Sequence, residues 1–249
     1  MGGLYLYGVI PTRTQEAFGR IGIGRKTPEV TSVAVRDVAC VVSPWEEETV
    51  PATAEHAQAH ERVLLTVFER FTVLPFEFGT VAPDPEMVKK LLRANLHRFK
   101  VALRRLQGKA EVQLVASWHN MQQIFDEILK DHHAIARYRQ EILRKPAEQT
   151  YHDRIQIGKM VAEALSHKKA QEAGQVAKGL RGRAVEGLVL EEPIGDAVVL
   201  RAFFLVKKDR VESFDQQLRS LDQRLDGRLD WKYTGPLPCY HFAHVPITL

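Results

Sequence analysis

The chain has little cysteine and no long apolar run, and each shortage excludes a class of protein. Its 249 residues include only Cys40 and Cys239, which lie far apart and form no CxxC or zinc-binding spacing. No apolar stretch approaches the roughly 20 residues of a membrane-spanning helix. The first residues lack the basic start of a signal peptide. We therefore expect a cytoplasmic protein with no membrane span.

An excess of charge of one sign is also missing. The chain carries 35 basic and 31 acidic residues, a net charge of +4. This mild balance does not require nucleic acid as a partner, although it permits acidic partners. The basic face of the helix expected over residues 85–106 has no interleaved aromatic side chains on which bases would stack. We expect no nucleic-acid partner, and interpret this face as a solvated surface or as a docking face for an acidic protein.

No group of residues has the pattern of a catalytic or metal site. His56 and His60 lie four apart on an expected helix, but no third ligand accompanies them. We interpret His60 as a residue at the border of the buried stripe that bonds to the backbone. The acidic loop over residues 46–48 has nothing to desolvate its carboxyl groups, and the glycines over 19–24 lack the βαβ unit of a phosphate site. We expect no enzyme activity, no cofactor and no metal.

The first half of the sequence predicts a small mixed α+β domain over residues 1–108. Cap signals define its helices, because Thr53 and Asp84 each precede an apolar stripe at helical spacing and Pro85 suits a first helical position. The expected elements are strands over residues 4–10 and 30–43 with a turn at Arg36 and Asp37, a helix from Thr53 to about Phe71, and a helix that starts at Pro85 and is ended by Gly108.

The second half predicts a domain over residues 109–249 with a modified ferredoxin-like fold. Its expected order is strand, long broken helix, strand, strand, helix, strand, which is that of the split βαβ motif. The expected features are a strand from Glu111, a helical region over 121–177 broken near Pro146, strands over 185–190 and 197–206 joined by a turn over 191–196, a helix capped by Asp209 and Glu212, and a strand from Leu229. The fold class is therefore α+β in two domains, with the boundary near residues 107–110.

The segment Thr72-Val-Leu-Pro-Phe-Glu-Phe-Gly-Thr-Val-Ala82 is the most informative part of the chain. A plain strand would avoid Pro75, which cannot donate a ladder hydrogen bond, and Gly79, which weakens a strand interior. Phe76 and Phe78 alternate with Glu77, so both rings are expected on one face. The segment predicts a bent edge strand or a loop, with both rings packed against a neighbouring helix.

The closing segment over residues 235–242 is rich in proline and aromatic residues. Two interpretations are open and compatible. The segment is an edge strand against the second sheet, or it exposes Leu237, Tyr240 and Phe242 to a partner.

Several segments together resemble one protein family. Residues 73–81, VLPFEFGTV, resemble the VLPxxFGTV segment of the GvpF/GvpL family of gas vesicle proteins. Residues 4–8 (LYLYG), 35–43 (VRDVACVVS), 60–64 (HERVL) and 234–240 (TGPLPCY) resemble further segments of that family in the same order. The matches extend over almost the whole chain, and the sequence looks more like the F-type branch.

The resemblance implies an accessory protein for gas vesicle assembly, associated with vesicles. Its implied partners are the small hydrophobic shell protein, bound early in assembly, and other accessory proteins. An unassembled apolar subunit is an aggregation hazard, so a soluble protein that shields it meets a physical need. The motif residues implied to have a structural or interaction role are Pro75, Phe76, Phe78, Gly79, Gly235, Pro236 and Tyr240. The alternative is a ligand-sensing or regulatory protein that uses the ferredoxin-like domain, which a pocket with convergent polar groups would favour.

Overall fold

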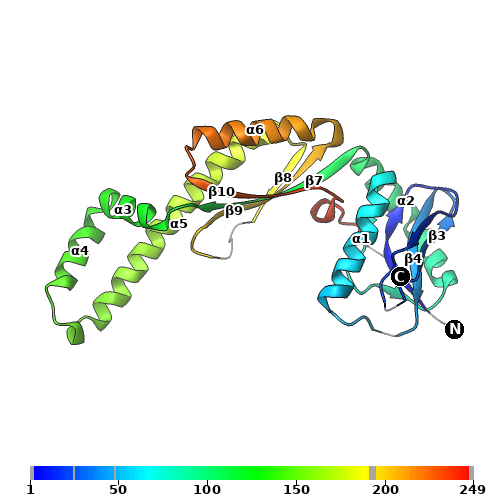
Figure 1. Ribbon diagram of the computed structural model, residues 1–249, viewed down its shortest axis with the longest axis horizontal. Helices are drawn as coiled ribbons and strands as arrows, with labels where there is room; N and C mark the ends of the chain where they lie inside the picture. Colours follow the sequence, from blue (N-terminus) through cyan, green and yellow to red (C-terminus); the bar gives the residue numbers. More distant parts are fainter. Residues whose placement is uncertain (1–2, 25, 48, 191–194, 247–249) are drawn as a thin grey trace. The chain divides into compact units, whose positions relative to one another are not determined.

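Figure 1 shows the computed structural model of the chain, which describes residues 3–24, 26–47, 49–190 and 195–246. Glu48 of the acidic loop and most of the turn expected over 191–196 lie outside the described residues. The chain forms two compact units. The first contains the chain up to Val112, Leu205–Asp209 and the segment from Gly235 onward; the second contains Gln113–Phe204 and Arg210–Thr234.

The first unit is built around a six-stranded sheet. Its strands are β1 (Gly3–Ile10), β2 (Ala17–Arg20), β3 (Glu29–Val35), β4 (Val38–Trp45), β5 (Leu74–Pro75) and β6 (Val81–Ala82), and its helices are α1 (Ala54–Arg70) and α2 (Pro85–Leu106). The order is β2-β3-β4-β1-β5, and β6 also pairs with β1. The sequence analysis missed β2, in which Gly19 sits at a register shift with a φ of 90°.

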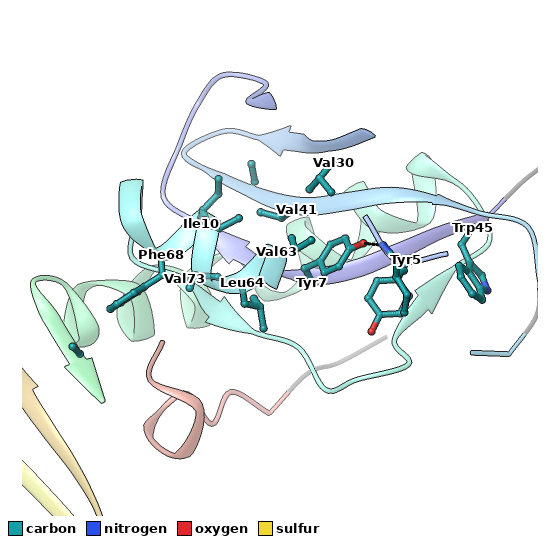
Figure 2. Close-up of a cluster of buried hydrophobic side chains, with 14 residues drawn as sticks. Tyr5, Tyr7, Ile10, Val30, Val41, Trp45, Val63, Leu64, Phe68 and Val73 are labelled. Atoms are coloured by element: carbon teal, nitrogen blue, oxygen red, sulfur yellow. Dashed lines mark hydrogen bonds between the residues drawn. The ribbon is translucent and has the colours of Figure 1, made fainter. Parts of the chain in front are cut away.

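Helices α1 and α2 cover opposite faces of this sheet. The side chains of Tyr5, Tyr7 and Val41 form one buried cluster with those of Val63 and Leu64 of α1 (Figure 2). Successive strand residues point to opposite faces, so Cys40 and Val42, which flank Val41 and are buried, point the other way. Helix α2 contacts β3 and β4 and supplies that second face. The near-continuous apolar sequence of β1 and β4 is explained by burial on both sides.

The helix starts of the first unit follow the sequence signals. The hydroxyl of Thr53 accepts a hydrogen bond from the backbone N–H of His56 at 3.2 Å. The carboxylate of Asp84 accepts one from the N–H of Met87 at 2.8 Å, and Pro85 occupies the first turn. Both predicted caps are confirmed, because a cap needs only residues that are neighbours in sequence.

The second unit contains most of a four-stranded sheet of order β10-β7-β9-β8. Its elements are strands β7 (Lys109–Trp118), β8 (Glu186–Val189), β9 (Val198–Lys207) and β10 (Leu229–Leu237), and helices α3 (Met121–Asp131), α4 (His133–Leu143), α5 (Tyr151–Arg181) and α6 (Val211–Arg224). The element order is that of the split βαβ motif, and the α+β class is confirmed. In Figure 1, α6 runs beside the second half of α5, and α4 beside its first half.

Two local predictions for this half need correction. The long helical region breaks at His132 as well as near Pro146, and His132 is neither glycine nor proline. The capping box of Asp209 and Glu212 is wrong, because Asp209 lies in a 3-10 turn over Lys208–Arg210 and α6 begins after Arg210 without a side-chain cap. None of the helices in the described ranges is long and apolar enough to cross a bilayer.

The boundary predicted near residues 107–110 coincides with Gly108, which ends α2 with a φ of 68° and directly precedes β7. The six-stranded sheet uses only strands before this glycine, and the four-stranded sheet uses only strands after it. The compact units nevertheless alternate along the chain, and the segment from Gly235 onward belongs to the first. A division into domains 1–108 and 109–249 stays a prediction.

Candidate protein-interaction site

The segment 72–82 attaches directly to the central strand of the first unit. Pro75 in β5 pairs with Gly8 of β1, and the backbone N–H of Phe76 donates to the carbonyl of Tyr7 at 2.9 Å. A Cβ atom on Gly8 would lie 2.5 Å from the carbonyl oxygen of Leu74. This close approach requires glycine at position 8 and holds the segment at the sheet edge.

A buried hydrogen-bond chain attaches the same segment to α1. The Tyr5 hydroxyl accepts from the N–H of Gly79 at 3.0 Å and lies 2.8 Å from Nδ1 of His60. The His60 ring also bonds to the backbone of Phe76. Burial disfavours the imidazolium and lowers the pKa of His60 to about 4. A neutral ring accepts from Tyr5 through Nδ1 and donates to the Phe76 carbonyl through its other nitrogen.

The expected role of His60 is confirmed. His60 is 8% exposed beside the buried stripe and bonds to the backbone, whereas Nδ1 of His56 lies 2.9 Å from the carbonyl of Pro51. The two histidines thus have different partners. Across the described residues, no group of three or more His, Cys, Asp or Glu side chains is placed to hold a metal. Gly79 has a φ of 88°, a left-handed conformation that a side chain disfavours.

The two phenylalanines of the segment both pack against helices, but not on one face as predicted. The Phe76 ring lies 6.4 Å from that of Phe99 in α2, and Phe76 is 8% exposed. The half-buried Phe78 ring lies 6.4 Å from Tyr5 and 5.9 Å from His60 in α1. The alternation fails because β5 ends at Pro75, and the turn that follows directs Phe78 to the opposite helix.

The closing segment packs onto the first unit. Leu237 and Phe242 are buried, and the half-buried Tyr240 packs against the cluster of Tyr5 and Val63. The alternative in which the segment exposes Leu237 and Phe242 to a partner is therefore wrong, whereas the edge-strand alternative agrees with β10, a terminal strand that runs to Leu237. The sequence did not reveal this because these partners lie about two hundred residues upstream, and no local pattern reports such a contact.

Hydrogen bonds complete the attachment of the closing segment. The buried carboxylate of Glu111 accepts from the backbone N–H of His241 at 2.8 Å and lies 2.8 Å from its Nδ1. A Cβ atom on Gly235 would lie 3.1 Å from the carbonyl oxygen of Glu111, so glycine permits this approach. The Tyr240 hydroxyl is buried without a hydrogen-bond partner among the described residues, and burial raises its pKa.

The seven predicted site residues are therefore placed together in the first unit. Pro236, in a cis peptide after Gly235, is the exposed member of the set. The other six are buried or half-buried and shape the sheet edge and its cover. A direct interaction role for these residues stays a prediction.

The basic face of α2 is partly used within the first unit. Lys89 pairs with Glu86 and Lys100 with Asp37, each at 2.6 Å. Arg98 donates to the carbonyl of Pro246 at 2.9 Å. These contacts favour the solvated, intramolecular interpretation of this face over a docking face for an acidic protein.

The clearest exposed apolar feature among the described residues is a terminal strand of the four-stranded sheet. Strand β8 is a terminal strand, and each of its residues is exposed. Val185, Leu188, Val189 and Leu190 are 37–52% exposed. Gly187 lies against the side of the Phe204 ring, since a Cβ atom built on Gly187 would lie 3.2 Å from atoms of that ring. An exposed apolar edge strand is a template for another chain.

The sequence analysis predicted this strand but not its exposure. The run Gly187-Leu-Val-Leu190 lacks the alternation of a one-sided strand, which favours burial on both faces. The charges that follow, Glu191 and Glu192, are the available sequence signal, because native edges often carry charged residues or proline that oppose aggregation.

The chain is similar in sequence to known gas vesicle proteins. The profile of the family "Gas vesicle synthesis protein GvpL/GvpF" matches residues 3–244. Gas vesicle protein F of a Streptomyces species is 27% identical over 240 residues, which cover 96% of this chain and 98% of that protein. Gas vesicle protein F of Microcystis aeruginosa is 25% identical over 246 residues, 98% of each chain.

Solved structures show the same fold. The crystal structure of GvpF from Anabaena sp. PCC7120 superposes with a TM-score of 0.83 over 99% of this chain and 100% of that one, at 23% identity. GvpF from Microcystis aeruginosa gives 0.78 over 98% and 99%, at 25% identity. A profile match over nearly the full length, together with this shared architecture, places the chain in the GvpL/GvpF family of gas vesicle synthesis proteins.

Proposed function

We propose that this protein acts in gas vesicle assembly by binding the small apolar shell subunit before it enters the vesicle wall, in the cytoplasm. The observation that carries the proposal is an exposed apolar edge strand, β8, on a member of this family. A soluble protein that pairs with a β-edge of the shell subunit would hold it apart from other copies.

The edge has the two features that strand addition uses. Main-chain groups supply affinity, and alternate side chains supply contact area. The N–H of Leu190 donates to the carbonyl of Arg201 in β9 at 2.9 Å. Successive N–H groups of a strand point in opposite directions, so the N–H of Val189 points away from β9. Val189 is therefore the position at which an added strand would take a hydrogen bond.

The experiment is co-purification of the shell protein with three forms of this protein, the wild type, Val189→Pro and Val189→Thr. Proline removes an N–H that β9 does not use, so pairing between β8 and β9 remains. Threonine retains the N–H and a β-branched side chain. We expect the wild type and Val189→Thr to bind the shell protein, and Val189→Pro to lose binding.

Salt and gene deletion separate the possible failures. Binding through apolar and backbone contacts should persist from low to physiological salt, because such contacts are not screened. Equal binding by all three forms would exclude the β8 edge while leaving shell binding in place. A deletion strain that makes normal vesicles, with no shell binding by the wild type, would refute the proposed function itself.

A further inference from the structure

Three helices of the second unit enclose an apolar groove. Helices α3, α4 and the first half of α5 surround a cavity of about 460 Å³. Its walls are mainly aliphatic, with Leu129, Ile142 and Val161 contributed by α3, α4 and α5 in that order. Figure 1 shows α4 and the facing part of α5 as a helical pair of this unit.

The groove leaves large apolar side chains exposed to water. Leu143, on its wall, is 74% exposed, the largest value among the described large apolar side chains. Phe125, also on the wall, is 36% exposed. Apolar stripes at helical spacing normally face a core. An apolar patch that stays exposed and contiguous marks an interaction surface.

A glycine leaves the groove open. Gly158 lies in the interior of α5 and lines the groove, and a Cβ atom built on it meets nothing within 4 Å. Glycine within a helix costs roughly 1 kcal/mol relative to alanine, so it gives α5 no advantage in stability. Its absent side chain lets another backbone approach closely.

The charges of the wall select for an acidic occupant. Arg139 and Arg154 line the groove, and neither guanidinium has a hydrogen bond or an ion pair within the described residues. The one carboxylate on the wall, Asp126, accepts from the amide of Gln122 at 3.0 Å. The nearby Lys145 is neutralised by Asp153 at 2.7 Å. As far as the described residues go, the groove therefore presents two positive charges without an ion-pair partner beside an apolar floor.

We infer that this groove binds an amphipathic helix of another protein, which inserts aliphatic side chains between α4 and α5 and places carboxylates against Arg139 and Arg154. A helix fits because its side-chain ridges pack into the groove between two helices. The carboxylates fit because a guanidinium binds them in a bidentate manner. The inference does not depend on the shell subunit or on β8, which is a separate surface of the sheet.

The first experiment identifies the occupant. A photo-crosslinking amino acid replaces Leu143 in cells that make gas vesicles, and the crosslinked peptide is mapped by mass spectrometry. We expect a segment of another protein with aliphatic residues spaced three and four apart and with carboxylates beside them. A crosslink to a second copy of this chain, to a segment without this pattern, or to nothing overturns the inference.

Two matched variants test the groove without disturbing the fold. Gly158→Met fills the groove, whereas Gly174→Met makes the same change at an exposed position of α5 where a Cβ atom also meets nothing within 4 Å. Both changes raise helix propensity. Gly158→Met should abolish the crosslink and Gly174→Met should preserve it. Equal crosslinking by both variants would show that the occupant lies elsewhere.

The charges are tested with the mapped segment made as a synthetic peptide. Replacement of Arg139 and Arg154 by glutamate should weaken peptide binding by roughly tenfold or more, because two attractions become two repulsions. The wild-type affinity should fall as salt rises. Affinity that is unchanged by both the substitutions and salt would overturn the acidic character of the occupant.

Discussion

The Arg228 guanidinium binds the Glu127 carboxylate through both terminal nitrogens, each at 2.8 Å from a carboxylate oxygen. It also donates to Glu172 at 2.8 Å, and so connects α3, α5 and the start of β10. These hydrogen bonds favour the ionised carboxylate and lower the pKa of Glu127 to about 2. One side chain therefore joins three elements of the second unit.

Loss of Arg228 should destabilise the protein. Arg228→Ala leaves two part-buried carboxylates without their main partner. This should lower the free energy of unfolding by about 2 kcal/mol. Arg228→Lys should restore only part of the lost free energy of unfolding, because an ammonium group cannot bind both carboxylates in a fork. The measurement is urea unfolding, with Arg224→Ala on the exposed side of α6 as the control. Equal stabilities for the Arg228→Ala and Arg224→Ala variants would contradict this account.

Removal of one hydroxyl should loosen the segment 72–82. Tyr5→Phe deletes the acceptor of the Gly79 N–H and the partner of His60, at a cost of about 1–3 kcal/mol. Hydrogen exchange at the Gly79 amide should accelerate. Tyr151→Phe is the control, since Tyr151 is 68% exposed. A Gly79 amide that exchanges as slowly as before would exclude the hydrogen bond.

Acid should destabilise the first unit through His60. Its pKa is lowered from 6.5 to about 4 in the folded chain by burial. The unfolded chain therefore binds more protons between these values, and the free energy of unfolding falls as the pH drops through this window. The loss is about 3 kcal/mol at most. His60→Gln cannot titrate, so its stability should change less with pH over the same range. Parallel pH profiles for the two proteins would show that His60 does not contribute.

Replacement of Phe76 and of Phe78 by alanine should lower the free energy of unfolding by different amounts. Phe76→Ala removes a ring that is 8% exposed and packed on Phe99, for a loss of roughly 3–4 kcal/mol. Phe78→Ala removes a half-buried ring, for roughly 1–2 kcal/mol. Each variant serves as the control of the other in thermal or urea unfolding. The reverse order would mean that Phe78 carries more of the packing than its exposure suggests.

Features that depend on neighbouring residues were predictable from the sequence. The caps at Thr53 and Asp84, the turn at Arg36 and the second-half order of strands and helices follow from local hydrogen bonding and apolar periodicity. The role of Gly79 was also accessible, because a glycine inside an apolar run signals a special backbone conformation.

Features that depend on distant residues were not predictable. Tyr240 packs against residues near the start of the chain, and nothing beside it in sequence indicates this. The exposure of Leu188 and Val189 depends on which strand ends the sheet, which is a property of topology. The break at His132 has no proline or glycine to mark it.

The division of the first unit into separate chain segments determines when it can be completed during synthesis. Its sheet and helices lie before Val112, but its cover includes Leu237, Cys239 and Phe242, near the end of the chain. A ribosome makes about 5–20 residues each second, so the early part waits seconds for its last pieces. Until the closing segment emerges, the surface that Tyr240 covers remains in contact with water and is available to chaperones.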